Sequence, residues 1–224
     1  MDERPVAIPP EAQAAFAALE RYVHPEPLVV ILSGPSGVGK DSAIRRMREL
    51  GYPFAFVVTA TDRPPRPGEV DGVDYRFLST AEFERLIAQG ELFEYAQVYG
   101  QYKGVPKKEV REALARGVDV ILRLDVQGAA TVRGLLPQAV SIFLAPPSLD
   151  VLVDRLRRRA GDSPQQIAQR LKTALDEMRR LEEFDYVVVN REGALDETAK
   201  QIAAIISAEK CRVVRFTRPC SVAG

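Results

Sequence analysis

Residues 28–50 read LVVILSGPSGVGKDSAIRRMREL, and this stretch decides the fold. It opens at 28–32 with an apolar run rich in β-branched residues, which is typical of a buried strand. Three glycines follow within residues 34–39, and Ile44 and Met47 then recur at helical spacing within residues 40–50. The stretch therefore predicts a strand, a glycine-rich turn and a helix, in that order.

Further short apolar runs follow along the chain, separated by segments with helical periodicity. They occupy residues 54–58, 118–124, 139–144 and 186–190. Strands that are buried on both faces of a parallel sheet show such continuous apolar runs, and helices form the connections between them. We therefore predict an α/β fold in which helices flank a parallel sheet, as in P-loop NTPases.

Residues 59–117 interrupt this alternation. The segment begins with a loop rich in proline and arginine and contains short alternating pieces such as LFEYAQVYGQY. Helical patterns cover residues 80–89 and 106–116. We interpret the segment as a subdomain inserted into the α/β core.

A second interruption covers residues 149–180. Two highly charged helical stretches are separated there by Gly, Asp, Ser and Pro at 161–164, with arginines concentrated around the break. This composition favours a mobile helical lid. The core of the domain, within residues 27–210, would then consist of residues 27–58, 118–148 and 181–210.

The two ends of the chain differ from the core. Residues 1–26 contain four prolines, with a fifth at Pro27, around one alanine-rich helical stretch at 11–22, which predicts an N-terminal helical extension. Residues 211–224 form a short basic tail. The acidic start lacks the basic region of a signal peptide, so we expect an unexported protein.

The composition excludes several classes of protein. The 224 residues include 31 basic and 31 acidic side chains, so no overall field draws the chain to nucleic acid or to a membrane surface. The single histidine, His24, and the two cysteines, Cys211 and Cys220, have no zinc-ligand spacing. We expect a cytoplasmic protein without nucleic-acid or membrane partners, and the oligomeric state stays open.

The glycine-rich turn has the sequence and the context of a phosphate-binding loop. GPSGVGK at 34–40 follows a predicted strand and opens a predicted helix, where backbone amides and the helix dipole favour phosphate. Lys40 would reach the β- and γ-phosphates of ATP. The alternative is an accidental glycine turn. The expected ATP-binding residues of this loop are Gly34, Pro35, Ser36, Gly37, Val38, Gly39, Lys40, Asp41 and Ser42.

One position departs from the usual loop pattern. A serine or threonine that ligates Mg²⁺ normally follows the lysine, but here Asp41 follows it and Ser42 comes next. Carboxylate and hydroxyl oxygens suit Mg²⁺, so both residues are candidate metal ligands and Mg²⁺ is the expected cofactor of ATP. Alternatively, Asp41 is a first-turn residue that the helix dipole favours.

Four further motifs accompany the loop: TATDRPPRPGEVDGVDY at 59–75, LFEYAQVYGQYKG at 92–104, LRLDVQGA at 122–129 and FDYVVVN at 184–190. With them the chain resembles the guanylate kinase family from about residue 28 to residue 210. The GKDS and QYKG variants resemble a plastid-like branch. The resemblance implies transfer of the γ-phosphoryl group of ATP to GMP, and we expect dGMP to be accepted as well.

The resemblance also implies an acceptor-phosphate site. Arg63 and Arg66 match the arginines that bind the GMP phosphate, and Tyr75 matches a phenol that donates to the same group. Lys103 stands where a phosphate-binding tyrosine is more familiar. The alternative interpretation of the two arginines is a solvated basic loop.

Residues that read the guanine base are implied in the same way. Glu94 matches a carboxylate that accepts both guanine donors, N1–H and N2–H₂, and Asp125 and Thr59 match further base contacts. Asp125 can alternatively cap the following helix. Two departures concern this site: Val105 replaces a hydroxyl expected near the guanine oxygen, and Arg123 replaces a more familiar acidic residue.

In the predicted lid, the resemblance places catalytic arginines at Arg155, Arg159 and Arg170, which would act together with Lys40 and Arg63. Asn190 matches a residue near the adenine of ATP. The other arginines of the segment, Arg157, Arg158, Arg179 and Arg180, are interpreted as solvated surface residues.

Two rival functions stay open from the sequence. One is a guanylate-kinase-like scaffold module that binds phosphopeptides, although such modules usually lack the loop glycines or the lysine. The other is a kinase for ribose bisphosphate, since the GKDS variant resembles those enzymes too.

Overall fold

The computed structural model describes residues 9–17, 19–65, 68–98, 100–158 and 164–213. Among the residues singled out by the sequence, Arg66, Arg159 and Cys220 lie outside these ranges.

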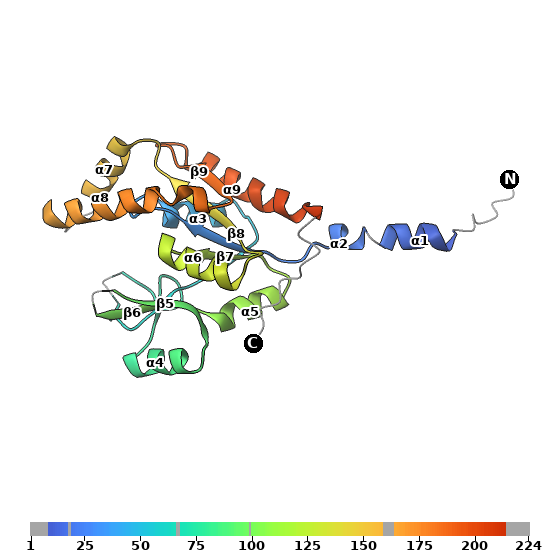
Figure 1. Cartoon of the computed structure of the whole chain (residues 1–224), viewed down its shortest axis with the longest axis horizontal. Helices are drawn as coiled ribbons and strands as arrows, with labels where there is room; N and C mark the ends of the chain where they lie inside the picture. The colour runs from blue at the N-terminus through green and yellow to red at the C-terminus, as the bar shows by residue number, and fades with distance from the viewer. Residues whose placement is uncertain (1–8, 18, 66–67, 99, 159–163, 214–224) are drawn as a thin grey trace.

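A five-stranded parallel sheet forms the centre of the molecule (Figure 1). Its strands, in spatial order, are β2 (Ala55–Val57), β7 (Val120–Arg123), β1 (Val29–Ser33), β8 (Val140–Ala145) and β9 (Tyr186–Val189). In β1, Val30 pairs with Ile121 on one side and with Val140 on the other. The sequence prediction of an α/β fold with a parallel sheet is confirmed.

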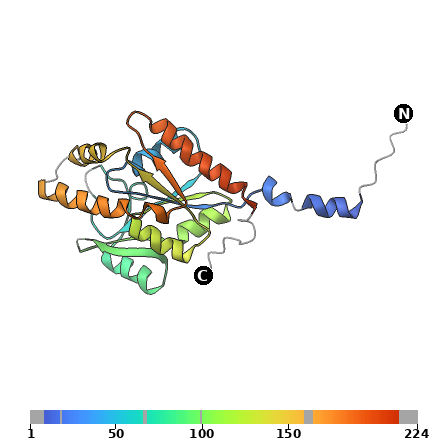
Figure 2. The ribbon, with the colours of Figure 1, turned by 45° about the horizontal axis from the view of Figure 1, so that its top comes forward.

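Helices cover both faces of this sheet, which explains why its strands are apolar on both sides (Figure 2). Val30 and Leu32 pack in one cluster with side chains of α3 (Lys40–Glu49) and α9 (Leu195–Lys210). The alternate residues of β1 pack on the opposite face with α5 (Lys107–Ala115) and α6 (Val126–Leu135).

A second, smaller sheet lies within the segment predicted as an insertion. Its strands are β4 (Arg76–Phe77), β3 (Ala60–Thr61), β6 (Gln101–Pro106) and β5 (Leu92–Val98), in this spatial order. Helix α4 (Thr80–Ala88) begins at a capping box formed by Ser79 and Glu82 and covers the sheet through the buried Phe83. Helix α5 follows in sequence but packs on the central sheet, so the smaller layer ends near Pro106.

The segment at 149–180 contains two helices, α7 (Leu149–Arg157) and α8 (Pro164–Met178). They contact each other through a small cluster around Leu152, Leu156 and Ala174. The end of α8 returns to the core, where Met178 packs beside Phe143 of β8. The short helix η1 (Leu181–Glu183) then leads into β9.

The N-terminal extension points away from the body of the molecule (Figure 1). Where the sequence predicts one helix over 11–22, the structure has α1 (Pro10–Ala17) and the single turn α2 (Glu20–Val23). His24 and Cys211 are exposed, and the Cys211 thiol is free. In the part of the chain that the structure describes, no helix is long and apolar enough to span a membrane.

Candidate active site

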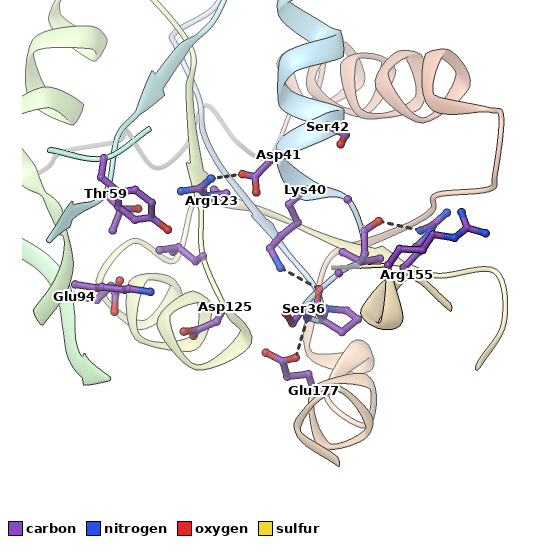
Figure 3. Close-up of a pocket in the computed structure, with 18 residues that line it drawn as sticks. Ser36, Lys40, Asp41, Ser42, Thr59, Glu94, Arg123, Asp125, Arg155 and Glu177 are labelled. Atoms are coloured by element: carbon purple, nitrogen blue, oxygen red, sulfur yellow. Dashed lines mark hydrogen bonds and ion pairs between the residues drawn. The ribbon is translucent and has the colours of Figure 1, made fainter. Parts of the chain in front are cut away.

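A cavity of about 590 Å³ opens at the carboxyl end of the central sheet, between the glycine-rich loop and the smaller sheet (Figure 3). Ligands of open α/β sheets bind at this edge. The lining residues come from separate parts of the chain: the loop residues Pro35 to Ser42, then Thr59, Tyr75, Glu94, Lys103, Arg123, Leu124, Asp125, Arg155, Arg158 and Glu177.

The loop has a backbone that side chains would not permit at two positions. Gly34 has φ of 133°, and a Cβ there would lie 2.1 Å from the carbonyl oxygen of Leu144. Gly39 has φ of 100°, and a Cβ there would lie 2.5 Å from Nδ2 of Asn190. Both positions therefore require glycine, which supports the interpretation of the motif as a built loop over that of an accidental turn.

Hydrogen bonds from side chains of other segments fix the conformation of the loop. Asn190 Nδ2 donates to the carbonyl oxygen of Val38 at 2.8 Å, and Thr198 Oγ1 donates to Asn190 Oδ1 at 3.1 Å. Arg155 donates to the same Val38 oxygen at 3.1 Å and to the carbonyl oxygen of Asn190 at 2.9 Å. Asn190 is only 6% exposed and does not line the cavity, so its side chain supports the loop.

Lys40 is folded back onto its own loop. Its Nζ donates to the carbonyl oxygens of Gly34 at 2.5 Å and Pro35 at 3.2 Å. Burial lowers the pKa of the Lys40 ammonium, and the nearby carboxylate of Glu177 opposes this effect. The ammonium therefore lies beside the loop amides, where phosphate oxygens are expected to bind.

Glu177, near the end of α8, lies against the phosphate loop at Ser36 (Figure 3). Its Oε2 accepts a hydrogen bond from the backbone N–H of Ser36 at 3.4 Å. Burial raises the pKa of the Glu177 carboxyl, while the charge of Lys40 opposes the increase. A carboxylate thus lies at a backbone amide of the glycine-rich loop and lines the cavity.

Asp41 and Ser42 lie in the first turn of α3 and both line the cavity. The carboxylate of Asp41 forms an ion pair with Arg123. In the described ranges no group of three or more histidine, cysteine or acidic side chains converges as a metal cage. One carboxylate and one hydroxyl beside a phosphate loop nonetheless fit Mg²⁺, which usually takes few protein ligands and completes its shell with water and phosphate oxygens.

Tyr75 lies at the centre of a group of cations on the wall opposite the loop. Arg63 Cζ is 4.8 Å from the centroid of the Tyr75 ring, and Lys103 Nζ is 5.9 Å from it. Arg63 is buried and forms two hydrogen bonds, of 2.6 and 2.7 Å, to the carboxylate of Glu69. Tyr75 and Lys103 line the cavity, so two predicted phosphate ligands meet there.

The three predicted base-reading residues, Glu94, Asp125 and Thr59, all line the cavity. Burial, with a smaller contribution from the charge of Asp125, raises the pKa of Glu94 to about 7. Asp125 Oδ1 also accepts from the N–H of Gly128 at 2.7 Å, so it caps α6 as well as facing the cavity. Thr59 lines the cavity on the same side as Glu94 (Figure 3). The absence of a side chain at Gly128 leaves room for Glu94, because a Cβ there would lie 3.1 Å from its Cδ.

A family profile described as guanylate kinase matches residues 26–209. The chain belongs to the guanylate kinase family. Guanylate kinase 2, chloroplastic/mitochondrial, from Oryza sativa subsp. japonica is 49% identical over 194 residues, which cover 86% of this chain and 68% of the relative. A guanylate kinase from Gloeobacter violaceus is 50% identical over 183 residues, covering 81% of this chain and 86% of the relative.

A solved structure agrees with the family assignment. The crystal structure of guanylate kinase from Anaplasma phagocytophilum has a TM-score of 0.66 and 35% sequence identity to this chain. The match covers 85% of this chain and 89% of that one. Both the sequence and the fold of the protein are thus those of a guanylate kinase.

The structure also gives the positions of three residues that the sequence analysis discussed. Val105 is 2% exposed and packs in the core beneath the sheet, so its side chain does not face the base site. Arg170 lies on α8 and does not line the cavity. Arg158, interpreted as a solvated residue, does line it, and its side chain is 70% exposed and pairs with Glu192.

Two contacts at the cavity were missed because the sequence carries no local signal for them. Glu177 is one acidic residue in a charged helix, and only the packing of α8 brings it to the phosphate loop. The contact between Asp41 and Arg123 joins residues 82 positions apart. The resemblance marked both members of this pair as departures but did not predict that they meet.

Proposed function

We infer that the protein transfers the γ-phosphoryl group of ATP to GMP, giving ADP and GDP, and that it also accepts dGMP. One observation carries this inference: a single cavity joins the phosphate loop with Lys40 to the buried carboxyl of Glu94 on the opposite wall. Two nucleotides can therefore bind with their phosphates facing each other. Similarity to guanylate kinases over most of the chain supports the same conclusion.

On the donor side, the amides of the phosphate loop surround the β- and γ-phosphates of ATP. The ammonium of Lys40 then replaces its hydrogen bonds to the carbonyl oxygens of Gly34 and Pro35 with hydrogen bonds to phosphate oxygens. Asp41 and Ser42 would hold Mg²⁺, which when bound neutralises charge on the β- and γ-phosphates. Asn190 acts on ATP through the loop that it supports.

On the acceptor side, Arg63, Tyr75 and Lys103 bind the phosphate of GMP, and Arg66 is proposed to join them. Arg63 exchanges its two bonds to Glu69 for phosphate oxygens, because guanidinium binds either anion with the same fork geometry. Residues 59–117 are thus proposed to be the GMP-binding subdomain.

The base is selected by hydrogen-bond polarity. An ionised Glu94 accepts from both guanine donors, N1–H and N2–H₂, whereas adenine presents an acceptor at N1. Asp125 and Thr59 complete the edge of the base. Because unmatched polar groups would stay buried, a site built in this way rejects the wrong base by about four orders of magnitude.

The chemical step needs positioning more than proton transfer. An anionic oxygen of the GMP phosphate attacks the γ-phosphorus, the bond from this phosphorus to the β,γ-bridging oxygen breaks, and ADP leaves with the electron pair. No general base is required because the attacking oxygen carries no proton. Arg155, Arg159 and Arg170 are proposed to stabilise the transferred group when residues 149–180 close as a lid.

A coupled assay of ADP release tests the function, with GMP, dGMP, AMP and ribose bisphosphate as alternative acceptors. We expect turnover with GMP and dGMP and only background release with the other two. Absence of turnover with GMP above the rate with ATP alone would refute the proposal, and preference for ribose bisphosphate would favour the rival kinase. We also propose that the protein has no nucleic-acid or membrane partners, since its 31 basic and 31 acidic residues balance. A cytoplasmic location is proposed because Cys211 and Cys220 have neither a CxxC nor a metal-ligand spacing.

A further inference from the structure

Arg123 lies between the donor and acceptor walls of the cavity. It is the last residue of β7, and its guanidinium reaches from there to the carboxylate of Asp41 on α3 (Figure 3). Its Cζ lies 5.5 Å from the ring centroids of both Phe56 and Tyr75. The side chain is only 17% exposed and lines the cavity. Arg123 thus contacts the first turn after the phosphate loop and the phenol of the acceptor site at once.

Three cations converge on the Tyr75 ring. Arg63 is 4.8 Å from its centroid, Arg123 is 5.5 Å and Lys103 is 5.9 Å away. Glu69 balances Arg63, and Asp41 balances Arg123. Lys103 forms no ion pair with any residue in the described ranges. Like charges repel at such separations, so this arrangement is most favourable when an anion binds among the cations.

The ion pair with Asp41 does not by itself explain the position of Arg123. The Asp41 side chain is 72% exposed, and ion pairs with so exposed a partner contribute little to stability. Arg123 is in contrast largely buried and held against two aromatic rings. Its position is therefore fixed by packing, while its anionic partner is the weakly held member of the pair and can be exchanged.

We propose that Arg123 binds the phosphate of the acceptor nucleotide on the side that faces the donor, and that Asp41 is its counter-ion in the empty site. This proposal rests on the proposed function, since it names a further ligand of the GMP phosphate. When GMP binds, the guanidinium exchanges the Asp41 carboxylate for phosphate oxygens, which carry more charge and match its fork geometry. The exchange also leaves the Asp41 carboxylate unpaired on the donor side.

Equilibrium binding of GMP in the absence of ATP and metal tests the proposal. Substitution of Arg123 by leucine removes a charge-assisted contact, so we expect the Kd for GMP to rise about tenfold to a hundredfold. Binding of guanosine, which lacks the phosphate, should be unchanged. Arg123→Lys should weaken GMP binding less, because it keeps the charge and loses the bidentate geometry.

The decisive variant is Asp41→Ser, because two explanations predict opposite results for it. If Arg123 binds phosphate, removing its competing carboxylate leaves GMP affinity unchanged or increases it severalfold. If the pair only ties α3 to β7, Asp41→Ser and Arg123→Leu should weaken GMP binding to the same extent. This variant keeps the proposal testable even if Arg123→Leu fails to fold.

A matched control is available on the same helix. Arg46 of α3 pairs with Asp196 of α9, also between distant elements, but outside the cavity. Arg46→Leu should bind GMP as the unmodified protein does. If the unmodified protein binds GMP and Arg123→Leu binds it equally well, the proposal for Arg123 is wrong. If the unmodified protein binds no GMP, the proposed function fails together with this inference.

Discussion

If Glu94 reads the guanine base as proposed, its pKa should make GMP binding dependent on pH. The carboxyl is buried and lies near the negative charge of Asp125, and these two effects raise its pKa to about 7. Only the ionised form accepts hydrogen bonds from both guanine donors. GMP therefore selects the ionised carboxylate, and its affinity should fall as the pH falls through 7. Substitution of Glu94 by glutamine removes this titration.

The size of the effect follows from the pKa. With a value of about 7, the carboxyl is about nine-tenths ionised at pH 8 and about one-tenth ionised at pH 6, so its contribution to GMP affinity changes about tenfold. At pH 8 the substitution replaces one acceptor oxygen by an amide donor that opposes a guanine donor. Loss of a charge-assisted hydrogen bond corresponds to about 1.5–3 kcal/mol, or roughly a tenfold to a hundredfold weaker affinity.

Calorimetric titration of GMP without ATP, at pH 6, 7 and 8, measures both quantities. The GMP phosphate titrates near pH 6 as well, but it does so equally for the protein and for Glu94→Gln, so the ratio of the two affinities isolates the carboxyl. That ratio should be about tenfold larger at pH 8 than at pH 6. Glu112→Gln, on the exposed face of α5, is the matched control. A ratio that stays constant with pH would refute the reasoning.

Three further predictions follow from the same cavity. Glu94→Gln should raise the free energy of unfolding of the ligand-free protein by up to about 3 kcal/mol at pH 8, because the pKa of Glu94 rises from 4.5 to about 7 on folding. Denaturant titration should show that this gain disappears as the pH falls towards 4.5. Gly39→Ala should weaken ATP binding more than tenfold by calorimetry, since its Cβ would lie 2.5 Å from Asn190 Nδ2. Gly117→Ala, with φ of 73° but open space around it, should leave ATP affinity unchanged, and equal effects of the two would contradict the steric argument. Glu177→Gln should lower the KM for ATP severalfold, since a carboxylate no longer competes with phosphate at the loop; a higher KM would show that Glu177 assists binding instead.

In the proposed acceptor site, some residues implied by the family resemblance lie where they were expected and one does not. The resemblance named Tyr75 and Lys103, and the structure brings both to one wall of the cavity. It also placed Val105 near the base, whereas the side chain is buried in the core. Lys103 and Val105 are two residues apart in β6, so regular alternation would place both side chains on one face. The register of β5 and β6 shifts opposite Val105, between Leu92 and Tyr95, and the sequence carries no signal for this irregularity.

The sequence by itself determined the parts of the protein that depend on neighbouring residues. GPSGVGK between an apolar run and a helical pattern predicts the phosphate loop, because backbone conformation at glycine and the dipole of the following helix act within a few residues. The apolar runs likewise predict a buried parallel sheet, and the cap formed by Asp125 follows from its place before α6.

Only the tertiary structure decided which distant side chains meet. Asn190 contacts the loop at Val38, Glu177 reaches Ser36, and Arg123 reaches Asp41, with between 82 and 152 residues separating the members of each pair. Such contacts depend on how helices and strands pack around the sheet, and no periodicity within a short window records that packing. For the same reason, only the packed structure shows that Arg123 lies between Asp41, next to the glycine-rich loop, and the ring of Tyr75.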